Sequence, residues 1–331
     1  MESFSAETLL KAAGNFMTCR IILTAAEMDL FTILSGAPLT AREAAERSGA
    51  DLRALTVLLD ALASLEFLTK ENDAYRCRPP LAPLLTAGSP ESVLPMILHY
   101  TGLWRRWSRL TAVVKGTEIP SRPDAPARKP DELRAFIGAM DVVAAPRARL
   151  IVAALNPGAA RSLIDVGGAS GTYTVAFLRA VPAMKATLFD LPEVVEIARD
   201  RMKAEGLMER VTLVPGDFYR DELPAGHDLA FLSAIIHQNS REQNRQLYAK
   251  VFRSLVTGGR VVIRDHVMTP DRTGPPEGAI FAINMLVGTA GGGTYTLKEI
   301  EEDLGQAGFG NVRLLREGKH MDALVEAFRP A

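Results

Sequence analysis

Apolar residues are spaced in two different ways along the 331-residue chain. Up to about residue 100 they recur every three or four positions, as in AETLLKAAGNFMTCRIILTAAEMDLFTIL, which predicts amphipathic helices. From Arg161 onward, short continuous apolar runs alternate with helical stretches; the runs are SLIDV, KATLFD, RVTLVPGD, DLAFLSA and RVVIRDH. Such runs indicate a parallel sheet covered by helices on both faces. The sequence therefore predicts a helical first half and an α/β second half.

The helical half carries the signals of a winged helix. In PLTAREAAERSG, Thr40 and Glu43 form the capping-box pattern that begins a helix, and Gly49 is placed to end it. DLRALTVLLDALASLEFL predicts a further amphipathic helix, and LTKENDAYRC predicts a short hairpin with Asn72 and Asp73 at its turn. Helices followed by a hairpin are the order of a winged helix.

Charge argues against DNA binding by this module. Between Pro38 and Arg78 there are six Lys or Arg residues and seven Asp or Glu residues, whereas neutralising several phosphates requires a basic surface. The net charge of −1 for the whole chain provides no attraction to nucleic acid or to an anionic membrane. We expect the module to bury its apolar face against another subunit.

Cysteine content and the N-terminal residues predict a cytoplasmic protein. Cys19 and Cys77 are too few for a disulfide framework and lack the spacing of metal ligands. MESFSAETLLKAAG has no basic segment followed by an apolar one, and no run of 18 apolar residues occurs. We therefore expect no signal peptide and no transmembrane span.

The proline-rich stretch PSRPDAPARKP predicts a surface connection between the two halves. We expect a first domain over residues 1–120, a linker and connecting helix over 121–155, and the α/β domain over 156–331. The last two predicted strands, NVRLLREG and DALVEAFR, leave no room for a crossover helix between them. They should therefore be antiparallel.

Three consecutive strands of the second half end in residues suited to a nucleoside. The glycine-rich segment 167–171 in LIDVGGASGTYT permits a tight turn and close approach of a ligand. Asp190 in FDLP can accept hydrogen bonds from two ribose hydroxyls, while Asp217 and Phe218 in GDF offer an acceptor for an adenine amine and a ring for the base. The glycine spacing is not that of a dinucleotide site, which disfavours a nicotinamide-dependent reductase. We predict a nucleoside-bearing cofactor.

His237 stands where the apolar run DLAFLSAII gives way to polar residues. A histidine in apolar surroundings is more often a core residue with a satisfied partner than a catalytic one. The residues alone leave both readings open.

Seven segments together resemble a known family: DVGGASG, FDLPEV, GDF, LSAIIH, LVTGGRVVIRDHV, INMLVGTAGGGTYTLKEI and AGF. They are similar to the dimerising, S-adenosylmethionine-dependent small-molecule O-methyltransferases of plant phenylpropanoid and flavonoid metabolism and of bacterial polyketide tailoring. LLDALASLEFL and LWRRWSRLTAVVKG extend the likeness over nearly the whole chain.

The resemblance implies a Rossmann-like class I methyltransferase fold. Its sheet would be seven-stranded and mostly parallel with an antiparallel C-terminal strand, preceded by a mostly helical winged-helix dimerisation domain. It also implies a homodimer, S-adenosyl-L-methionine as cofactor, an aromatic small-molecule acceptor and no metal.

The resemblance further assigns roles to residues. It makes His237 the general base and Asp265, where relatives have a glutamate, its orienting partner. The implied cofactor-binding set is Gly167, Gly168, Asp190, Leu191, Asp217, Phe218 and Ser233, the last replacing a lysine of many plant relatives. The implied acceptor-lining set is Met140, Met285, Thr289 and Thr294.

A histidine base favours an acidic hydroxyl. A phenol has a pKa near ~10 and neutral histidine near ~6.5, a gap of roughly 3.5 units or ~4.8 kcal/mol that bond formation can offset. An aliphatic alcohol, near water's ~15.7, would leave about nine units. A phenol or enol is therefore the expected acceptor group.

Two departures from the family pattern leave alternatives open. The HDW-like run reads HQN, with Gln238 and Asn239, and one of two flanking glutamates falls on Thr294. The same fold could methylate nitrogen or carbon, or bind the cofactor for other chemistry. A transcription regulator using the winged helix is disfavoured by the charge count.

Overall fold

The computed structural model describes residues 5–120 and 130–330, and it divides into two compact units between Trp104 and Arg105. Most of the proline-rich stretch that we predicted as a surface connection, residues 121–129, lies outside the described residues. The domain boundaries expected at 120 and 155 remain a prediction.

The first unit is mostly helical and contains the predicted capped helix and hairpin. Thr40 and Glu43 form the capping box at the start of α4, and Gly49 ends that helix in the left-handed region at φ +66°. Asn72 and Asp73, at φ +48° and +62°, join two antiparallel strands. The elements are α1 (Ala6–Gly14), α2 (Phe16–Glu27), α3 (Leu30–Ile33), β1 (Leu39–Thr40), α4 (Ala41–Ser48), α5 (Leu52–Ser64), β2 (Leu68–Glu71), β3 (Ala74–Cys77), α6 (Ala82–Leu85) and most of α7 (Leu94–Trp107).

The N-terminal helices of this unit expose apolar side chains. No residue of α1 is buried, and Leu10 is 74% exposed. Leu9, Phe16 and Met17 are each more than half exposed. An apolar stripe of this kind matches the expectation that the module covers part of its surface with another subunit.

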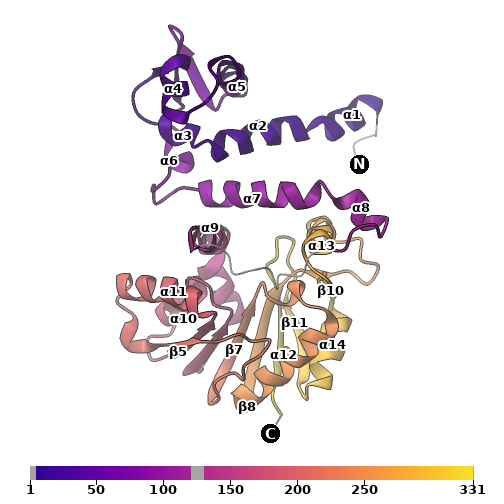
Figure 1. Cartoon of the computed structure of the whole chain (residues 1–331). Coiled ribbons are helices and arrows are strands. Elements are labelled where there is room, and N and C mark those ends of the chain that lie inside the picture. The colour runs from indigo at the N-terminus through magenta and orange to yellow at the C-terminus, as the bar shows by residue number, and fades with distance from the viewer. Residues whose placement is uncertain (1–4, 121–129, 331) are drawn as a thin grey trace. The chain divides into compact units, whose positions relative to one another are not determined.

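The second unit is built on a seven-stranded sheet of order β11-β12-β8-β7-β4-β5-β6 (Figure 1). Strand β12 runs antiparallel to both β8 and β11, as predicted, and the other pairings are parallel. Its elements are α8 (Leu110–Val114), α9 (Pro130–Leu155), β4 (Ser162–Val166), α10 (Thr172–Ala180), β5 (Lys185–Asp190), α11 (Pro192–Ala204), η1 (Met208–Arg210), β6 (Val211–Pro215), β7 (His227–Ser233), η2 (Ile236–Gln238), α12 (Arg241–Ser254), β8 (Leu255–Asp265), β9 (Val267–Met268), α13 (Pro276–Gly288), β10 (Tyr295–Thr296), α14 (Leu297–Gln306), β11 (Gly310–Arg316) and β12 (Ala323–Phe328).

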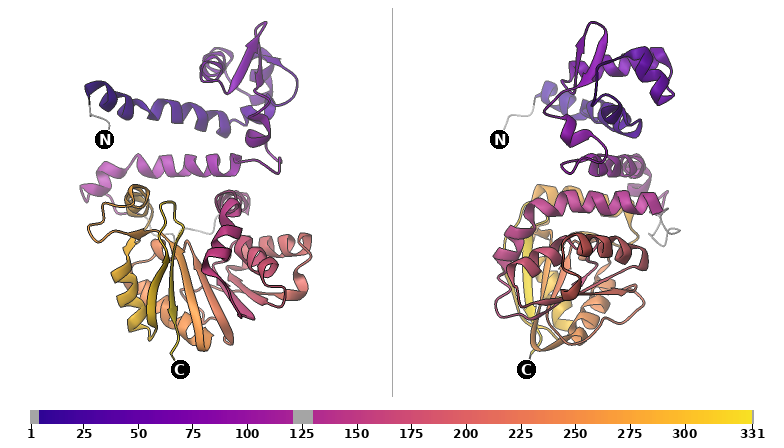
Figure 2. Two further views of the ribbon diagram at one scale, coloured as in Figure 1. Left: turned by 180° about the vertical axis from the view of Figure 1, so that it is seen from behind. Right: turned by 90° about the vertical axis from the view of Figure 1, so that its left-hand side faces the viewer.

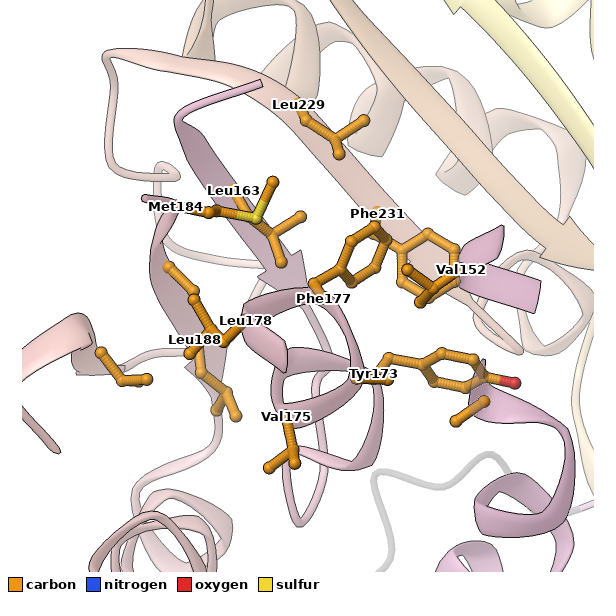
Figure 3. Close-up of a cluster of buried hydrophobic side chains, with 14 of the residues drawn as sticks. Val152, Leu163, Tyr173, Val175, Phe177, Leu178, Met184, Leu188, Leu229 and Phe231 are labelled. Carbon is orange, nitrogen blue, oxygen red and sulfur yellow. The ribbon is translucent and has the colours of Figure 1, made fainter. Parts of the chain in front are cut away.

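Helices cover both faces of this sheet, as the continuous apolar runs predicted (Figure 2). One face packs against α9, α10 and α11, where Phe177 and Tyr173 of α10 contact Phe231 of β7 (Figure 3). The other face packs against α12 and α14. Alternate residues of each strand therefore enter different cores, so strand alternation decides the face on which each polar side chain lies.

Helices long and apolar enough to cross a membrane are absent from the described parts of the chain.

Candidate functional site

The glycine-rich loop between β4 and α10 is shaped for close approach of a ligand. Gly167 has φ +70°, and a Cβ atom on it would lie 2.5 Å from Cδ1 of Ile235 and 3.8 Å from the ring of Phe218. A Cβ on Gly168 would lie 2.8 Å from Cγ of Leu188. Because these two positions have no room for a side chain, a ligand at this edge of the sheet can approach the backbone of the loop closely.

Replacing Gly167 with alanine should lower the free energy of unfolding by more than the left-handed backbone alone explains. We expect about 1–2 kcal/mol from that conformation and a further ~1–3 kcal/mol from the clash with Ile235. Gly206→Ala is the matched control, because Gly206 has φ +68° and no atom within 4 Å of the added Cβ. Urea unfolding measures both, and Ile235→Val, which removes Cδ1, should restore part of the loss. Equal losses for the two glycines would contradict the clash.

Asp190, the last residue of β5, has each carboxylate oxygen held by a backbone N–H group, one from the glycine loop and one from the start of α11. Its Oδ2 accepts the backbone N–H of Ala169 at 2.8 Å, and its Oδ1 accepts that of Leu191 at 2.7 Å. Each oxygen retains a lone pair for a further donor, as two ribose hydroxyls require. Leu191 is 45% exposed beside it, at the start of α11.

A buried carboxyl, Asp165, and a partly buried one, Asp190, lie next to this loop. Burial raises the pKa of Asp190 to about 6. Burial also raises the pKa of Asp165 to about 6, although Thr174 donates to it at 2.6 Å and acts in the opposite direction. The loop therefore rests on groups that gain protons in a mildly acidic solution.

Cofactor affinity should fall as the pH drops below about 6. Only the ionised form of Asp190 accepts from both ribose hydroxyls, and below its raised pKa the ligand-free chain holds a proton there. The dissociation constant should rise by up to about tenfold per pH unit below that point and stay flat above about pH 7. Calorimetric titrations from about pH 5 to about pH 8 measure this. Asp190→Asn should abolish the dependence, and its persistence would assign it to Asp165.

Asp217 and Phe218 follow β6 at the same edge. Asp217 accepts the backbone N–H of Tyr219 on Oδ1 at 2.9 Å, while Oδ2 faces Arg220 at 3.6 Å. The ring of Phe218 lies 4.6 Å from that of Tyr219. The ring of Phe218 therefore lies beside the glycine loop, and Asp217 precedes it in the chain.

His237 lies on the short 3₁₀ turn η2 and not on a strand. β7 ends at Ser233, because Ala234 adopts the left-handed conformation at φ +57° and turns the chain out of the ladder. The apolar run continues to Ile236, but these residues are buried by side-chain packing and not by strand pairing. The ring therefore stands just beyond the carboxyl end of the fourth strand of this unit.

His237 and Asp265 form a buried pair. Nδ1 of His237 lies 2.9 Å from Oδ2 and 3.0 Å from Oδ1 of Asp265, and the two side chains are 11% and 1% exposed. Burial alone would raise the pKa of Asp265, but His237 and the backbone N–H of His266 outweigh it and lower that pKa. The ionised carboxylate holds the proton on Nδ1, which leaves Nε2 as the acceptor.

Phe281 on α13 is a contact that the sequence analysis did not identify. Its ring meets that of His237 edge to face, with centroids 4.8 Å apart, and lies 5.1 Å from the ring of His266. Phe281 stands four residues before Met285, so the helical repeat from that predicted lining residue would have pointed to it.

The predicted acceptor-lining residues fall on α9 and around α13. Met285 is buried on α13, and Met140 is partly buried on α9. The hydroxyl of Thr289 donates to the carbonyl of Met285 and accepts the N–H of Gly292, both at 2.8 Å. Thr294 is buried beyond that turn. Thr289 therefore shapes the loop that follows α13, and a role of these four residues in acceptor binding remains a prediction.

Other histidines lie elsewhere. His227 begins β7 and bonds to Ser162 at 2.9 Å, at the opposite end of the strand from Ser233. His320 pairs with Glu277 at 2.6 Å and is exposed. His99 belongs to the first unit. His227 thus bonds to a hydroxyl and not to a carboxylate, and the carboxylate pair of His320 is exposed, unlike that of His237.

Comparison with known proteins decides the family. Residues 123–310 match the family model of the O-methyltransferase domain, and residues 10–83 match that of the O-methyltransferase dimerisation domain. The chain belongs to the O-methyltransferase family. It is an S-adenosylmethionine-dependent methyltransferase that carries the family's dimerisation domain.

Individual relatives of this methyltransferase agree over nearly its whole length. It is 33% identical to 3-hydroxy-5-methyl-1-naphthoate 3-O-methyltransferase of Streptomyces sahachiroi over 303 residues, covering 89% of this chain and 87% of the relative. It is 26% identical to the N,N-dimethyltransferase OxyT of Streptomyces rimosus, covering 97% and 94% of the two chains. The crystal structure of human N-acetylserotonin methyltransferase with S-adenosylmethionine superposes with a TM-score of 0.83 at 25% identity, covering 100% and 99%.

The edge residues of this methyltransferase fit its cofactor. Asp190 has two oxygens with free lone pairs, as two ribose hydroxyls would require, and a Cβ on Gly167 would clash with Ile235. Ser233 accepts a hydrogen bond on Oγ from Nη1 of Arg264 at 3.1 Å. The hydroxyl of Ser233 therefore already accepts a hydrogen bond from a guanidinium group.

Proposed function

We propose that this methyltransferase transfers a methyl group from S-adenosylmethionine to a phenol or enol hydroxyl of an aromatic small molecule, with His237 as the general base. The observation that carries the proposal is the buried His237–Asp265 pair beyond β7, at the edge where Gly167 and Asp190 stand. The 3-O-methyltransferase specificity named for the Streptomyces sahachiroi relative supports an aromatic hydroxyl as acceptor.

In this mechanism the residues place and deprotonate the acceptor. The acceptor hydroxyl would donate to Nε2 of His237, which would take its proton as the oxygen acts as the nucleophile. Asp265 keeps the imidazole in the required tautomer and stabilises the imidazolium that forms. Phe281 fixes the ring edge-on and excludes water from it. S-adenosylmethionine, when bound, would supply an electrophilic methyl group and would leave as S-adenosylhomocysteine, so positioning of the acceptor would provide much of the acceleration.

The cofactor roles follow from the same edge. Asp190 would accept the ribose hydroxyls, with Leu191 against the sugar, and Asp217 and Phe218 would hold the adenine. Gly167 and Gly168 would face the methionine part. These assignments rest on the free lone pairs and the cramped glycines described above.

Product analysis with matched acceptors tests the proposed function. Hydroxynaphthalenes and the corresponding aminonaphthalenes would be incubated with methyl-labelled S-adenosylmethionine, and the methylated atom identified by mass spectrometry and NMR. We expect methyl ethers from the hydroxyl series and little product from the amines. Exclusive N- or C-methylation would overturn the proposal.

Nitrogen methylation is the second candidate, and Thr294 favours it. A neutral amine needs no strong base, so loss of one of the family's two flanking carboxylates would be tolerated. The N,N-dimethyltransferase relative supports this alternative within the same fold. An unchanged kcat in a His237→Ala variant would favour nitrogen methylation.

We also propose that the chain works as a homodimer through its first unit. The match to the dimerisation domain and the exposed apolar residues of α1 and α2 support this arrangement. Sedimentation of the wild type against a Leu10→Glu variant would test it, since a buried charge should dissociate the pair.

A further inference from the structure

Arg264 is a buried cation with unsatisfied donors. It is the penultimate residue of β8 and only 3% exposed. Its Nη1 donates to Ser233, but its Nε and Nη2 have no hydrogen-bond partner, and it joins no ion pair with the described residues. A buried guanidinium without a counter-ion is costly, so this side chain requires an anion that the described chain does not supply.

The free donors of Arg264 have the geometry of a carboxylate site. Nε and Nη2 lie side by side on the guanidinium, and this pair forms parallel hydrogen bonds to the two oxygens of a carboxylate. The bond from Nη1 to Ser233 fixes the plane of the group with that pair left free. The guanidinium carbon lies 5.3 Å from the ring centre of Tyr173, whose buried hydroxyl is also unpartnered. Arg264 thus has two buried donors without a partner, and the Tyr173 hydroxyl is a further buried donor on a residue that contacts this guanidinium.

Strand order places this position at the methionine end of the cofactor. Asp217, proposed for the adenine, follows β6, and Asp190, proposed for the ribose, ends β5. The glycine loop follows β4, and β7 and β8 come next in the sheet. Ser233 pairs directly with Arg264 across β7 and β8. β7 lies about 10 Å from β5, so a methionine chain that extends from the ribose past the glycine loop arrives beside Ser233.

We propose that Arg264 binds the carboxylate of the methionyl group of S-adenosylmethionine, with Ser233 as the residue that orients its guanidinium. Tyr173, in the first turn of α10, donates its hydroxyl to the same carboxylate. The charge at this subsite comes from β8, while β7 contributes only the small hydroxyl of Ser233. The inference rests on the cofactor and not on the base, so it holds whether or not His237 acts as proposed.

Binding measurements with three ligands test the proposal without turnover. The probes are S-adenosylmethionine, decarboxylated S-adenosylmethionine and 5′-methylthioadenosine, titrated calorimetrically into wild type, Arg264→Met and Arg264→Lys. Wild type should prefer S-adenosylmethionine over the decarboxylated form by about 10- to 100-fold, the worth of a hydrogen-bonded charge. Arg264→Met should lose this preference, while binding 5′-methylthioadenosine within about twofold of wild type.

Arg264→Lys keeps the charge but loses the paired donors, so it should retain only part of the preference. This variant and the wild-type comparison decide the matter if Arg264→Met does not fold. Equal weakening of all three ligands would overturn the proposal in favour of a structural role. An unchanged preference in Arg264→Met would also overturn it. A third result would also overturn the proposal. If Arg264→Met changed only the KM for carboxylated aromatic acceptors, Arg264 would be assigned to the carboxylate of the acceptor.

Discussion

Replacing His237 with asparagine should lower kcat for methylation of a phenol by about 10²- to 10⁴-fold, the contribution of a positioned general base. Asparagine can still donate to Asp265 through its amide, so the buried carboxylate keeps a partner and the fold is retained. The loss should shrink for more acidic phenols, because an acceptor already ionised in solution needs no base. Steady-state kinetics over a series of nitro- and halophenols measures both effects.

Two further variants complete this test. His320→Ala removes an exposed histidine paired with Glu277 and should leave kcat unchanged. Asp265→Asn should lower kcat and change its pH profile, because the amide no longer enforces the tautomer with Nε2 free. A loss in His237→Asn that is the same for every phenol, whatever its acidity, would argue against proton removal. Full activity in that variant would exclude His237 as the base.

Asp190→Ala should weaken S-adenosylhomocysteine binding by about 10²- to 10⁴-fold. Two hydrogen bonds from ribose hydroxyls to a buried carboxylate are worth roughly 1.5–3 kcal/mol each. The variant also leaves the N–H groups of Ala169 and Leu191 without their acceptor, so part of the loss comes from the loop. Asp190→Asn keeps an acceptor oxygen and should lose less. Calorimetric titration gives the dissociation constants.

A ligand lacking one hydroxyl separates these two contributions. Wild type should bind 2′-deoxy-S-adenosylhomocysteine more weakly than the parent compound, whereas Asp190→Ala should not distinguish them. Asp200→Ala, which removes an exposed carboxylate of the neighbouring helix α11, is the matched control and should bind as wild type does. Wild-type affinity in Asp190→Ala would refute the assignment of the ribose to this residue.

Features set by neighbouring residues were predictable from the sequence. The capping box of Thr40 and Glu43, the hairpin at Asn72 and Asp73, and the antiparallel β12 each follow from a few adjacent positions and are present. The parallel sheet followed from apolar runs too continuous for a sheet with one face in solvent. Local chemistry and burial pattern therefore predicted these elements in both units.

The extent of β7 and the state of Arg264 were not predictable in this way. The apolar run up to Ile236 overstates the strand, because Ala234 turns the chain while the following side chains remain buried by contacts with distant segments. Arg264 lies in β8. The alternation of side chains along a strand predicts which face it occupies, but not whether a counter-ion lies near it. The partners of Asp265 and the contact of Phe281 with His237 likewise depend on segments far apart in the chain.

The last two residues of β8 are Arg264, proposed to bind the cofactor, and Asp265, proposed to orient the base. Alternation turns Arg264 toward Tyr173 and the core under α10, and turns Asp265 to the opposite face, where it meets His237. Pairing with β12, Asp265 opposite Ala323 and Arg264 opposite Leu324, holds that assignment. A slip of one residue in this ladder would exchange the two side chains, leaving His237 without its orienting carboxylate and placing a carboxylate where the guanidinium now lies. Strand β12 carries none of the proposed catalytic or cofactor-binding residues. Its pairing with β8 nevertheless helps to fix the register that places Arg264 and Asp265 on opposite faces of the sheet.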